Sequence, residues 1–266
     1  MNSPDELLVS HDQDGAVVEV TFNRPHRHNA FTTVMYEGLR DLFGQLHHDA
    51  SARVVVFRGA GAMAFAAGNE IGEFAGMTEG AQAVAYEARV RDLLTDLALL
   101  PQVSVAAVDG LCVGGGLAVA TYCDLRLATS GSRFGYPIAR TLGNALSRPL
   151  LERCVHVFGE SVARQMLLAS RLIDARRAYD LGALLAVADS RVELDRELHA
   201  LVEGLLQAAP TTVATTKEQL FAITESGGDP ALDAQLLERA YSSDAFREGV
   251  RAFLAKERPN FHGAPS

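Results

Sequence analysis

Residues 103–128 read VSVAAVDGLCVGGGLAVATYCDLRLA, and the class of fold can be inferred from them. The β-branched run at 103–108 predicts a buried strand, and the apolar segment that follows the glycines predicts a helix. A second short apolar run, at 124–128, predicts another strand. A strand, a helix and a strand in so short a stretch indicate an α/β core.

The same alternation continues on both sides of this stretch. Short apolar runs predict further strands at 15–22, 52–57 and 184–189, and two amphipathic stretches predict helices at 35–46 and 87–100. From about residue 195 the strand-like runs cease, and the remaining apolar segments have helical spacing. We therefore expect an α/β core followed by a helical tail.

The composition restricts the class of protein. The chain has 266 residues, of which 48% are hydrophobic, and it is long enough to bury a large core. Its formal net charge of −9 argues against a nucleic-acid or anionic-membrane surface, since both require a basic face. The three cysteines lack paired spacing, so they indicate neither a disulfide framework nor a metal site. With no signal-like start and no long apolar run, we expect a cytoplasmic protein.

Gly114 to Gly116 lie where the strand at 103–108 gives way to the predicted helix. A helix N-terminus exposes unpaired backbone N–H groups and a positive dipole, so this turn is a candidate site for negative charge. A plain tight turn is the alternative. Two phosphate-binding motifs are excluded, because Leu117 and Val119 stand where a P-loop lysine and a dinucleotide-loop glycine are required.

A second glycine turn follows the strand at 52–57, and two such turns could aim two backbone N–H groups at one oxygen. Five segments of the chain then match one pattern in order: TFNRP and HNA within 21–30, AFAAGNEI at 64–71, VAAVDGLCVGGGLAVATYCDLRLA at 105–128, FGYP at 134–137 and REGVRAFLAKERPNF at 247–261. Together these segments resemble the crotonase superfamily of enoyl-CoA hydratases and isomerases, and the resemblance covers nearly the whole chain.

The resemblance implies a crotonase-like spiral of ββα repeats over residues 1–195. It also implies a C-terminal helical region, residues 196–266, that forms a homotrimer or a dimer of trimers. The substrate would be an acyl-CoA thioester, with coenzyme A as part of the substrate and no further cofactor or metal.

The resemblance also implies the position of the reacting oxygen. In such enzymes the thioester carbonyl lies between two backbone N–H groups, which fall here at Asn69 and Gly115. Glycine lets the backbone come within hydrogen-bonding distance of the acyl oxygen, and the helix N-terminus favours the negative charge of an enolate.

Coenzyme A would bind, by the same resemblance, along the segment 24–30 and the turn before Asn69. The residues of this set are Arg24, His26, Arg27, His28, Ala30, Ala66 and Ala67. Near the C-terminus, Phe253 and Lys256 would reach the coenzyme A of a neighbouring subunit. The basic cluster at 24–28 could meet phosphates or could be a solvated loop.

The sequence departs from the family pattern where hydratases carry two glutamates that flank the acyl chain. It has Ala118 and Ile138 at these positions. Water addition needs one group to activate water and another to deliver a proton, and neither alanine nor isoleucine can do this. Simple hydration is therefore doubtful.

Ionisable residues near the vacated positions are the candidate replacements. Tyr136 could hold a water or donate a proton, Arg140 would favour a carboxylate substituent, and Glu73 follows the first glycine turn. Each of the first two has a plain alternative, with Tyr136 as a half-buried strand residue and Arg140 as a surface charge.

Three functions follow. The first is a lyase or isomerase that acts on a CoA thioester through an enolate, with relocated acid/base groups. The second is a CoA-thioester hydrolase or decarboxylase in which Arg140 or His28 handles a carboxylate or water. The third is a catalytically silent trimer that binds acyl-CoA.

Overall fold

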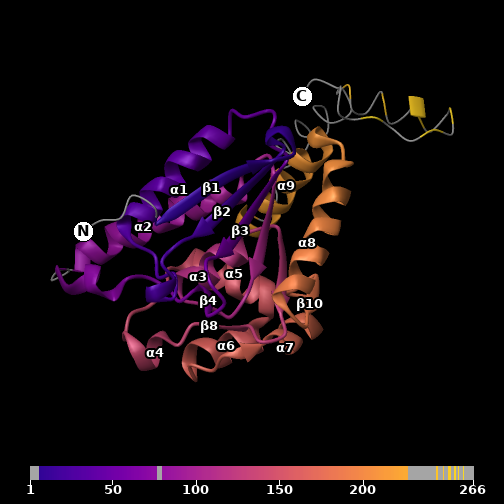
Figure 1. The fold of residues 1–266 in the computed structure, drawn as a ribbon. Coiled ribbons are helices and arrows are strands. Elements are labelled where there is room, and N and C mark those ends of the chain that lie inside the picture. The colour runs from indigo at the N-terminus through magenta and orange to yellow at the C-terminus, as the bar shows by residue number, and fades with distance from the viewer. Residues whose placement is uncertain are drawn as a thin grey trace.

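The computed structural model describes residues 6–76 and 80–226, together with Asp244, Glu248, Arg251, Ala252, Ala255, Glu257 and Asn260. A six-stranded sheet forms its centre (Figure 1). The strand order is β1 (Leu7–Asp12), β2 (Val17–Phe22), β3 (Val54–Gly59), β5 (Val103–Val108), β7 (Leu125–Thr129) and β10 (Ala186–Ala188). All neighbours pair in parallel except β1 and β2, which are antiparallel.

A second, four-stranded sheet contains only very short strands. Its order is β4 (Ala64–Ala66), β6 (Leu111–Val113), β8 (Arg133–Gly135) and β9 (Ile173–Asp174). Each of β4, β6 and β8 follows a strand of the large sheet after a short turn and precedes a helix. This succession is the ββα repeat that the family resemblance implies, and the fold class is confirmed.

The helices surround these sheets. They are α1 (Thr33–Leu46), α2 (Gly80–Ala98), α3 (Gly115–Tyr122), α4 (Ile138–Thr141), α5 (Arg148–Phe158), α6 (Glu160–Leu168), α7 (Ala175–Asp180), α8 (Arg191–Leu206) and α9 (Pro210–Ser226). Three short 3-10 helices, η1 (Gln13–Gly15), η2 (Pro25–Arg27) and η3 (Ile71–Gly76), connect elements in the N-terminal part.

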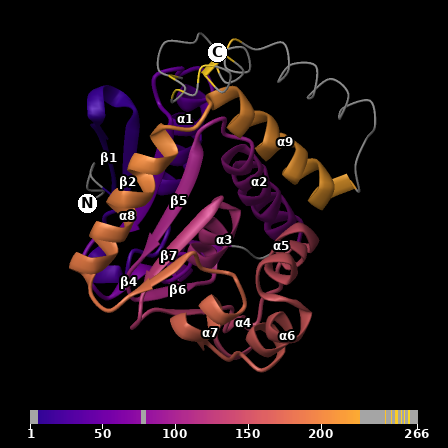
Figure 2. The ribbon, with the colours of Figure 1, turned by 90° about the vertical axis from the view of Figure 1, so that its right-hand side faces the viewer.

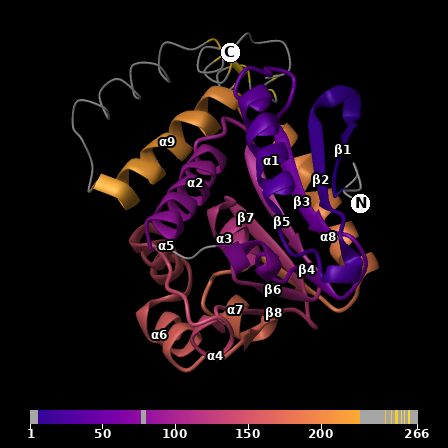
Figure 3. The ribbon, with the colours of Figure 1, turned by 90° about the vertical axis from the view of Figure 1, so that its left-hand side faces the viewer.

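Alternating side chains of the large sheet build a core on each face. Along β3, Val55 and Phe57 join the core beneath α1, α2 and α3, whereas Val54 and Val56 pack against α8. Helix α8 lies across one face of the sheet, and α1 to α3 cover the other (Figures 2 and 3). The division expected at residue 195 thus falls inside α8, a helix that packs on the sheet.

Helix α9 is attached to the sheet by a partly buried polar link. Asp124 accepts hydrogen bonds from Ser104 N (2.7 Å) and Ser104 Oγ (2.8 Å), and it pairs with Lys217 Nζ of α9 at 2.6 Å. Lys217 is buried and also donates to the carbonyl of Gln102. A lysine charge in this position needs its carboxylate partner, because burial without one is costly.

The substitution Asp124→Asn is expected to lower the free energy of unfolding by about 2 kcal/mol, the range for a lost hydrogen bond to a charged group. Urea denaturation followed by circular dichroism measures this change. Glu160→Gln, which breaks an exposed pair with Arg164, is the control and should change stability by less than about 0.5 kcal/mol. Equal effects of the two variants would contradict the structural role of Asp124.

Candidate active site

The first arm of the site is the turn after β4. Gly68 has a φ of +95°, a left-handed conformation that favours glycine. On either side of Asn69, Gly68 O accepts from Phe31 N (2.8 Å) and Glu70 N donates to Phe31 O (2.7 Å). Since backbone groups alternate in direction along a parallel pair, the N–H of Asn69 points away from Phe31. Asn69 lines a pocket.

The second arm is the start of α3. Gly114 has a φ of +54° and caps the helix, and its N–H donates to Gly135 O of β8 (3.1 Å). Gly115 N belongs to the first helical turn, where N–H groups have no partner within the helix. A Cβ on Gly114 would stand 3.2 Å from Gly68 Cα, so the two turns are in contact.

The close packing of α3 against β4 and the first turn explains the other two glycines of the triplet. A Cβ on Gly116 would stand 2.3 Å from the carbonyl oxygen of Ala66 in β4, and one on Gly115 would stand 2.5 Å from Asn69 Oδ1. Both distances are shorter than van der Waals contact allows. The chain therefore needs glycine at these positions to bring α3 against the first turn.

The side chain of Asn69 is held from α1. Tyr36 OH donates to Asn69 Oδ1 at 2.7 Å, and burial raises the pKa of Tyr36 well above its usual value. Tyr36 is absent from the sequence-based candidates, because it stands among the apolar residues of the helix predicted at 35–46. The hydroxyl of Tyr36 was the only feature in the sequence that could have indicated a role at the site.

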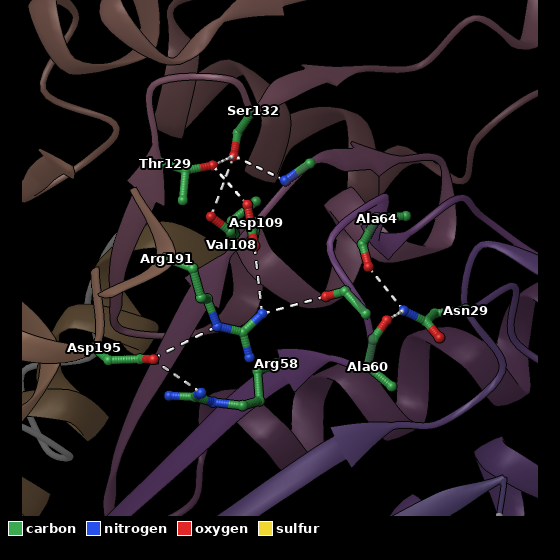
Figure 4. A network of polar contacts seen from close by, with 12 residues as sticks. Asn29, Arg58, Ala60, Ala64, Val108, Asp109, Thr129, Ser132, Arg191 and Asp195 are labelled. Atoms are coloured by element: carbon green, nitrogen blue, oxygen red, sulfur yellow. Dashed lines mark hydrogen bonds and ion pairs between the residues drawn. The ribbon is translucent and has the colours of Figure 1, made fainter. Parts of the chain in front are cut away.

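A polar network fixes the connections that lead into both arms (Figure 4). Asn29 Nδ2 donates to the carbonyls of Ala60 (3.0 Å) and Ala64 (2.7 Å), which bracket the link between β3 and β4. Asp109, between β5 and β6, accepts from Thr129 Oγ1 at 2.9 Å and pairs with Arg191 at 3.4 Å. These contacts hold the backbone on which the two arms depend.

Two adjoining pockets open beside the arms. The inner pocket, of about 100 Å³, is lined by Tyr36, Ala67, Gly68, Asn69, Ile71, Phe74, Tyr86, Glu87, Val90, Val113, Gly114, Gly115, Ala118, Tyr136, Pro137, Ile138, Thr141, Leu142, Asn144, Leu146 and Leu150. The outer pocket, of about 620 Å³, is lined by Asn69, Phe74, Ala83, Val84, Tyr86, Glu87, Ala88, Arg91, Leu142, Asn144, Ala145, Leu146 and Ser147. Ala118 and Ile138, the two positions where the resemblance implies glutamates in hydratases, both line the inner pocket.

The three candidate acid/base residues lie in different surroundings. Tyr136 forms part of the inner wall and is fully buried, and burial and the core thiols of Cys154 and Cys112 raise its pKa well above the usual value. Arg140 is exposed on α4 and lines neither pocket. Arg140 has the plain surface position that was its alternative. Tyr136 differs from its alternative of a half-buried strand residue, because it is fully buried and follows the end of β8.

Glu73 serves the start of α1. Its carboxylate accepts from Thr33 N (3.0 and 3.1 Å) and from Thr33 Oγ1 (2.8 Å). A negative charge in this place favours the helix N-terminus. Glu73 is exposed and lines neither pocket.

The basic cluster at 24–28 divides into an internal and an external part. Arg24 is buried and pairs with Glu6 (3.2 Å) and Glu70 (2.9 Å), and it also donates to Ala30 O. The hydrogen bond from Arg24 lowers the pKa of Glu70. Arg24 is thus engaged inside the protein.

The external part consists of His26, Arg27 and His28, which are exposed on η2 and the turn after it. Of the other residues expected near coenzyme A, Ala67 lines the inner pocket and Ala66 is buried in β4 against α3. Phe253 and Lys256 lie outside the described residues.

Glu87 of α2 lines both pockets and is absent from the sequence-based candidates. Its Oε2 atom is buried and has no hydrogen-bond partner among the described residues. Burial raises the pKa of Glu87, although the main-chain N–H and hydroxyl of nearby Ser147 favour the charged form. The sequence does indicate that Glu87 lies on the apolar face of the helix, because it stands three and seven residues before Val90 and Leu94.

Two further findings concern the described residues alone. They contain no group of three or more histidine, cysteine, aspartate and glutamate side chains placed to hold a metal ion. No helix within them combines the length and the apolar character that a bilayer span requires.

Comparison with known proteins identifies the family. The family model for enoyl-CoA hydratase/isomerase matches residues 12–264, and the chain belongs to this family. A putative enoyl-CoA hydratase of Thermus thermophilus is 33% identical over 258 residues, covering 94% of this chain and 98% of the relative. The human mitochondrial enoyl-CoA hydratase domain-containing protein 2 is 29% identical over 255 residues, covering 94% and 87%.

Solved structures give the same result for the fold. An enoyl-CoA hydratase/carnithine racemase from Magnetospirillum magneticum superposes with a TM-score of 0.88 at 32% identity, over 97% of this chain and 96% of that one. An enoyl-CoA hydratase from Mycobacterium smegmatis gives 0.87 at 28% identity, over 97% and 99%. The fold is that of the crotonases.

Proposed function

We propose that the protein acts on a CoA thioester by stabilising the enolate of its acyl group, as a lyase or isomerase. The contact between the two glycine turns supports this proposal, because it brings Asn69 and Gly115 to one pocket, where their N–H groups could meet the same oxygen. A thioester carbonyl between them would gain two hydrogen bonds as negative charge moves onto its oxygen.

The rest of the substrate would extend from this point in two directions. The acyl chain would enter the inner and outer pockets, and coenzyme A would leave past Ala67 toward the exposed His26, Arg27 and His28. A homotrimer or a dimer of trimers, with Phe253 and Lys256 at the neighbouring subunit's coenzyme A, is part of the same proposal. So is a cytoplasmic location.

Simple hydration is not part of the proposal. The two positions that would carry the hydratase glutamates hold Ala118 and Ile138, and both face the inner pocket. Neither residue can activate water or deliver a proton. The reaction would therefore be one that requires enolate formation without this pair.

Incubation with a panel of acyl-CoAs in D₂O, followed by mass spectrometry, tests the proposal. The panel contains crotonyl, 3-hydroxybutyryl, 3-enoyl and dicarboxylic acyl-CoAs. We expect deuterium to enter the 3-enoyl thioester. Hydration of crotonyl-CoA should be at least about 100-fold slower than in a hydratase with both glutamates, because one acid/base group contributes about this factor.

Other outcomes separate the alternatives. Release of free coenzyme A would identify a hydrolase, and loss of carbon dioxide from a dicarboxylic thioester would identify a decarboxylase. Thioesters that bind but return unchanged and undeuterated would contradict the enzymatic proposal and favour a silent acyl-CoA-binding protein.

A further inference from the structure

The inner pocket contains one carboxylic acid among the lining residues that the structure describes, and this is Glu87. It projects from α2, whereas the vacated positions Ala118 and Ile138 belong to α3 and α4. All three residues line the same pocket as Asn69 and Gly115. An acid/base group is thus present on a different wall of the site.

The other titratable groups of the described inner wall are tyrosines. Burial raises the pKa values of Tyr36, Tyr86 and Tyr136 above their usual value, so these phenols stay protonated near neutral pH. Tyr36 is also committed to Asn69 Oδ1 through its hydroxyl. None of the three can readily accept a proton, and a carboxylate can.

The position of Glu87 suits contact with a substrate. It is half-buried and lines both pockets. The N–H and hydroxyl of Ser147 favour its charged form, while its Oε2 atom has no hydrogen-bond partner among the described residues. Buried polar atoms in proteins normally have a partner, so an unpaired carboxylate oxygen in a pocket indicates a group that acts on a ligand.

We propose that Glu87 is the acid/base residue that removes and returns the substrate proton next to the thioester carbonyl, an inference that rests on the proposed function. The carboxylate takes the proton from the α-carbon, and the C–H electron pair forms a double bond to the carbonyl carbon. The carbonyl π electrons move to the oxygen, which the N–H groups of Asn69 and Gly115 would stabilise.

The enolate then has two fates that balance without a further reactant. Return of the proton to the α-carbon regenerates the substrate and exchanges hydrogen with solvent through Glu87. In a 3-enoyl thioester, delivery to the γ-carbon instead shifts the double bond to the 2-position. One carboxylate is sufficient for both fates, which distinguishes them from hydration by two glutamates.

The substrate class follows from the pockets. The outer pocket has an apolar lining that includes Phe74, Val84 and Leu146, and it shares Glu87 with the inner pocket. An acyl chain that continues from the inner into the outer pocket would pass this carboxylate. We therefore expect 3-enoyl thioesters with an unbranched apolar chain to react faster than short or dicarboxylic ones.

Glu87→Gln tests the inference in the full-length protein with 3-hexenoyl-CoA in D₂O. Glutamine keeps the size of the side chain and removes the charge, so the variant should fold. We expect deuterium incorporation and isomerisation to fall by at least about 100-fold, while the dissociation constant of the thioester changes less than about threefold. Asp92→Asn, on the exposed side of the same helix, is the matched control and should keep the wild-type rates.

The outcomes distinguish this inference from the proposed function. If the wild type exchanges deuterium and Glu87→Gln exchanges it equally fast, Glu87 is not the acid/base residue and the enolate proposal stands. If the wild type binds the thioester without exchange, both are wrong. A loss of thioester binding in Glu87→Gln that matches the loss of rate would also overturn the acid/base role.

The pH dependence supplies a second readout. A base must be ionised, so exchange should fall as the pH drops through the pKa of Glu87, which burial raises above its ordinary value. The other titratable or charged groups that line this part of the pockets are Tyr36 from α1, Tyr86 and Arg91 from α2, and Tyr136 after β8. Glu73 from η3 lines neither pocket, but its charge acts on Tyr36 and Tyr86. In Glu87→Gln this acidic limb should disappear from the residual rate, and an unchanged limb would contradict the assignment.

Discussion

Replacement of Gly115 by alanine is expected to lower the turnover of a CoA thioester by on the order of 10²–10³, the typical effect of losing one oxyanion donor. The new Cβ would stand 2.5 Å from Asn69 Oδ1 and 3.0 Å from Tyr36 OH. The Asn69 side chain must therefore move, and its backbone N–H is the other proposed donor. Steady-state kinetics with the best thioester of the panel measure the effect, which should appear in kcat.

A second substitution tests the cause of this loss. Trimming the obstructing side chain in the double variant Asn69→Ala/Gly115→Ala keeps both backbone N–H groups and removes the closest clash. Turnover should recover at least tenfold relative to Gly115→Ala. Gly131→Ala is the control for a glycine substitution as such, because a Cβ there meets nothing within 4 Å. An unaltered kcat in Gly115→Ala would contradict the proposed site.

Gly116→Ala is expected to lower the free energy of unfolding by about 3 kcal/mol, the upper end for overpacking a core. Its Cβ would stand 2.3 Å from the oxygen and 2.9 Å from the carbonyl carbon of Ala66. These atoms belong to the backbone of β4, so no side chain can rotate away. Helix α3 and β4 would have to separate, and urea denaturation would report the cost.

The matched control is a glycine in an open helix. Gly44 lies within α1, and a Cβ there meets nothing within 4 Å. Gly44→Ala should raise the free energy of unfolding by about 0.5–1 kcal/mol, because alanine restricts the unfolded chain and favours the helix. If the free energy of unfolding falls in Gly116→Ala and rises in Gly44→Ala, the loss is due to the α3–β4 contact. Changes of the same sign in the two variants would contradict this explanation.

Long apolar segments were predictable from the sequence, and short or exposed ones were not. Strand β5 occupies the expected residues 103–108, and the strands expected at 52–57 and 124–128 appear as β3 and β7, shifted by one or two residues. Strand β1 was missed, because nearly all its residues are exposed and it is held by backbone pairing with β2. The strands β4, β6 and β8 have three residues each, too few to display a period.

The glycine turns of the candidate site were predictable from the sequence, and the side chains that tertiary packing brings to its pockets were not. Glycines mark the turns at Asn69 and Gly115 directly in the sequence. Helical spacing places Glu87 on the apolar face of α2, but the pocket that it lines depends on how α2 packs against α3 and the loop at Ser147, which no local pattern indicates. Arg24 looked like a phosphate ligand beside its basic neighbours, yet its partners Glu6 and Glu70 come from elsewhere in the chain.

The parallel alignment of β4, β6 and β8 has a consequence for how such a protein can change its chemistry over evolutionary time. The three strands end side by side, and the chain after each contributes to the inner pocket, through Asn69, Gly115 and Ile138 respectively. The first two contribute backbone groups, which a side-chain mutation does not remove. The segment after β8 contributes the side chain of Ile138. The carbonyl of Gly135, which accepts the hydrogen bond from Gly114 N, lies before this segment. If Asn69 and Gly115 bind the carbonyl as proposed, mutations after β8 can exchange the reaction while these backbone groups are inherited unchanged.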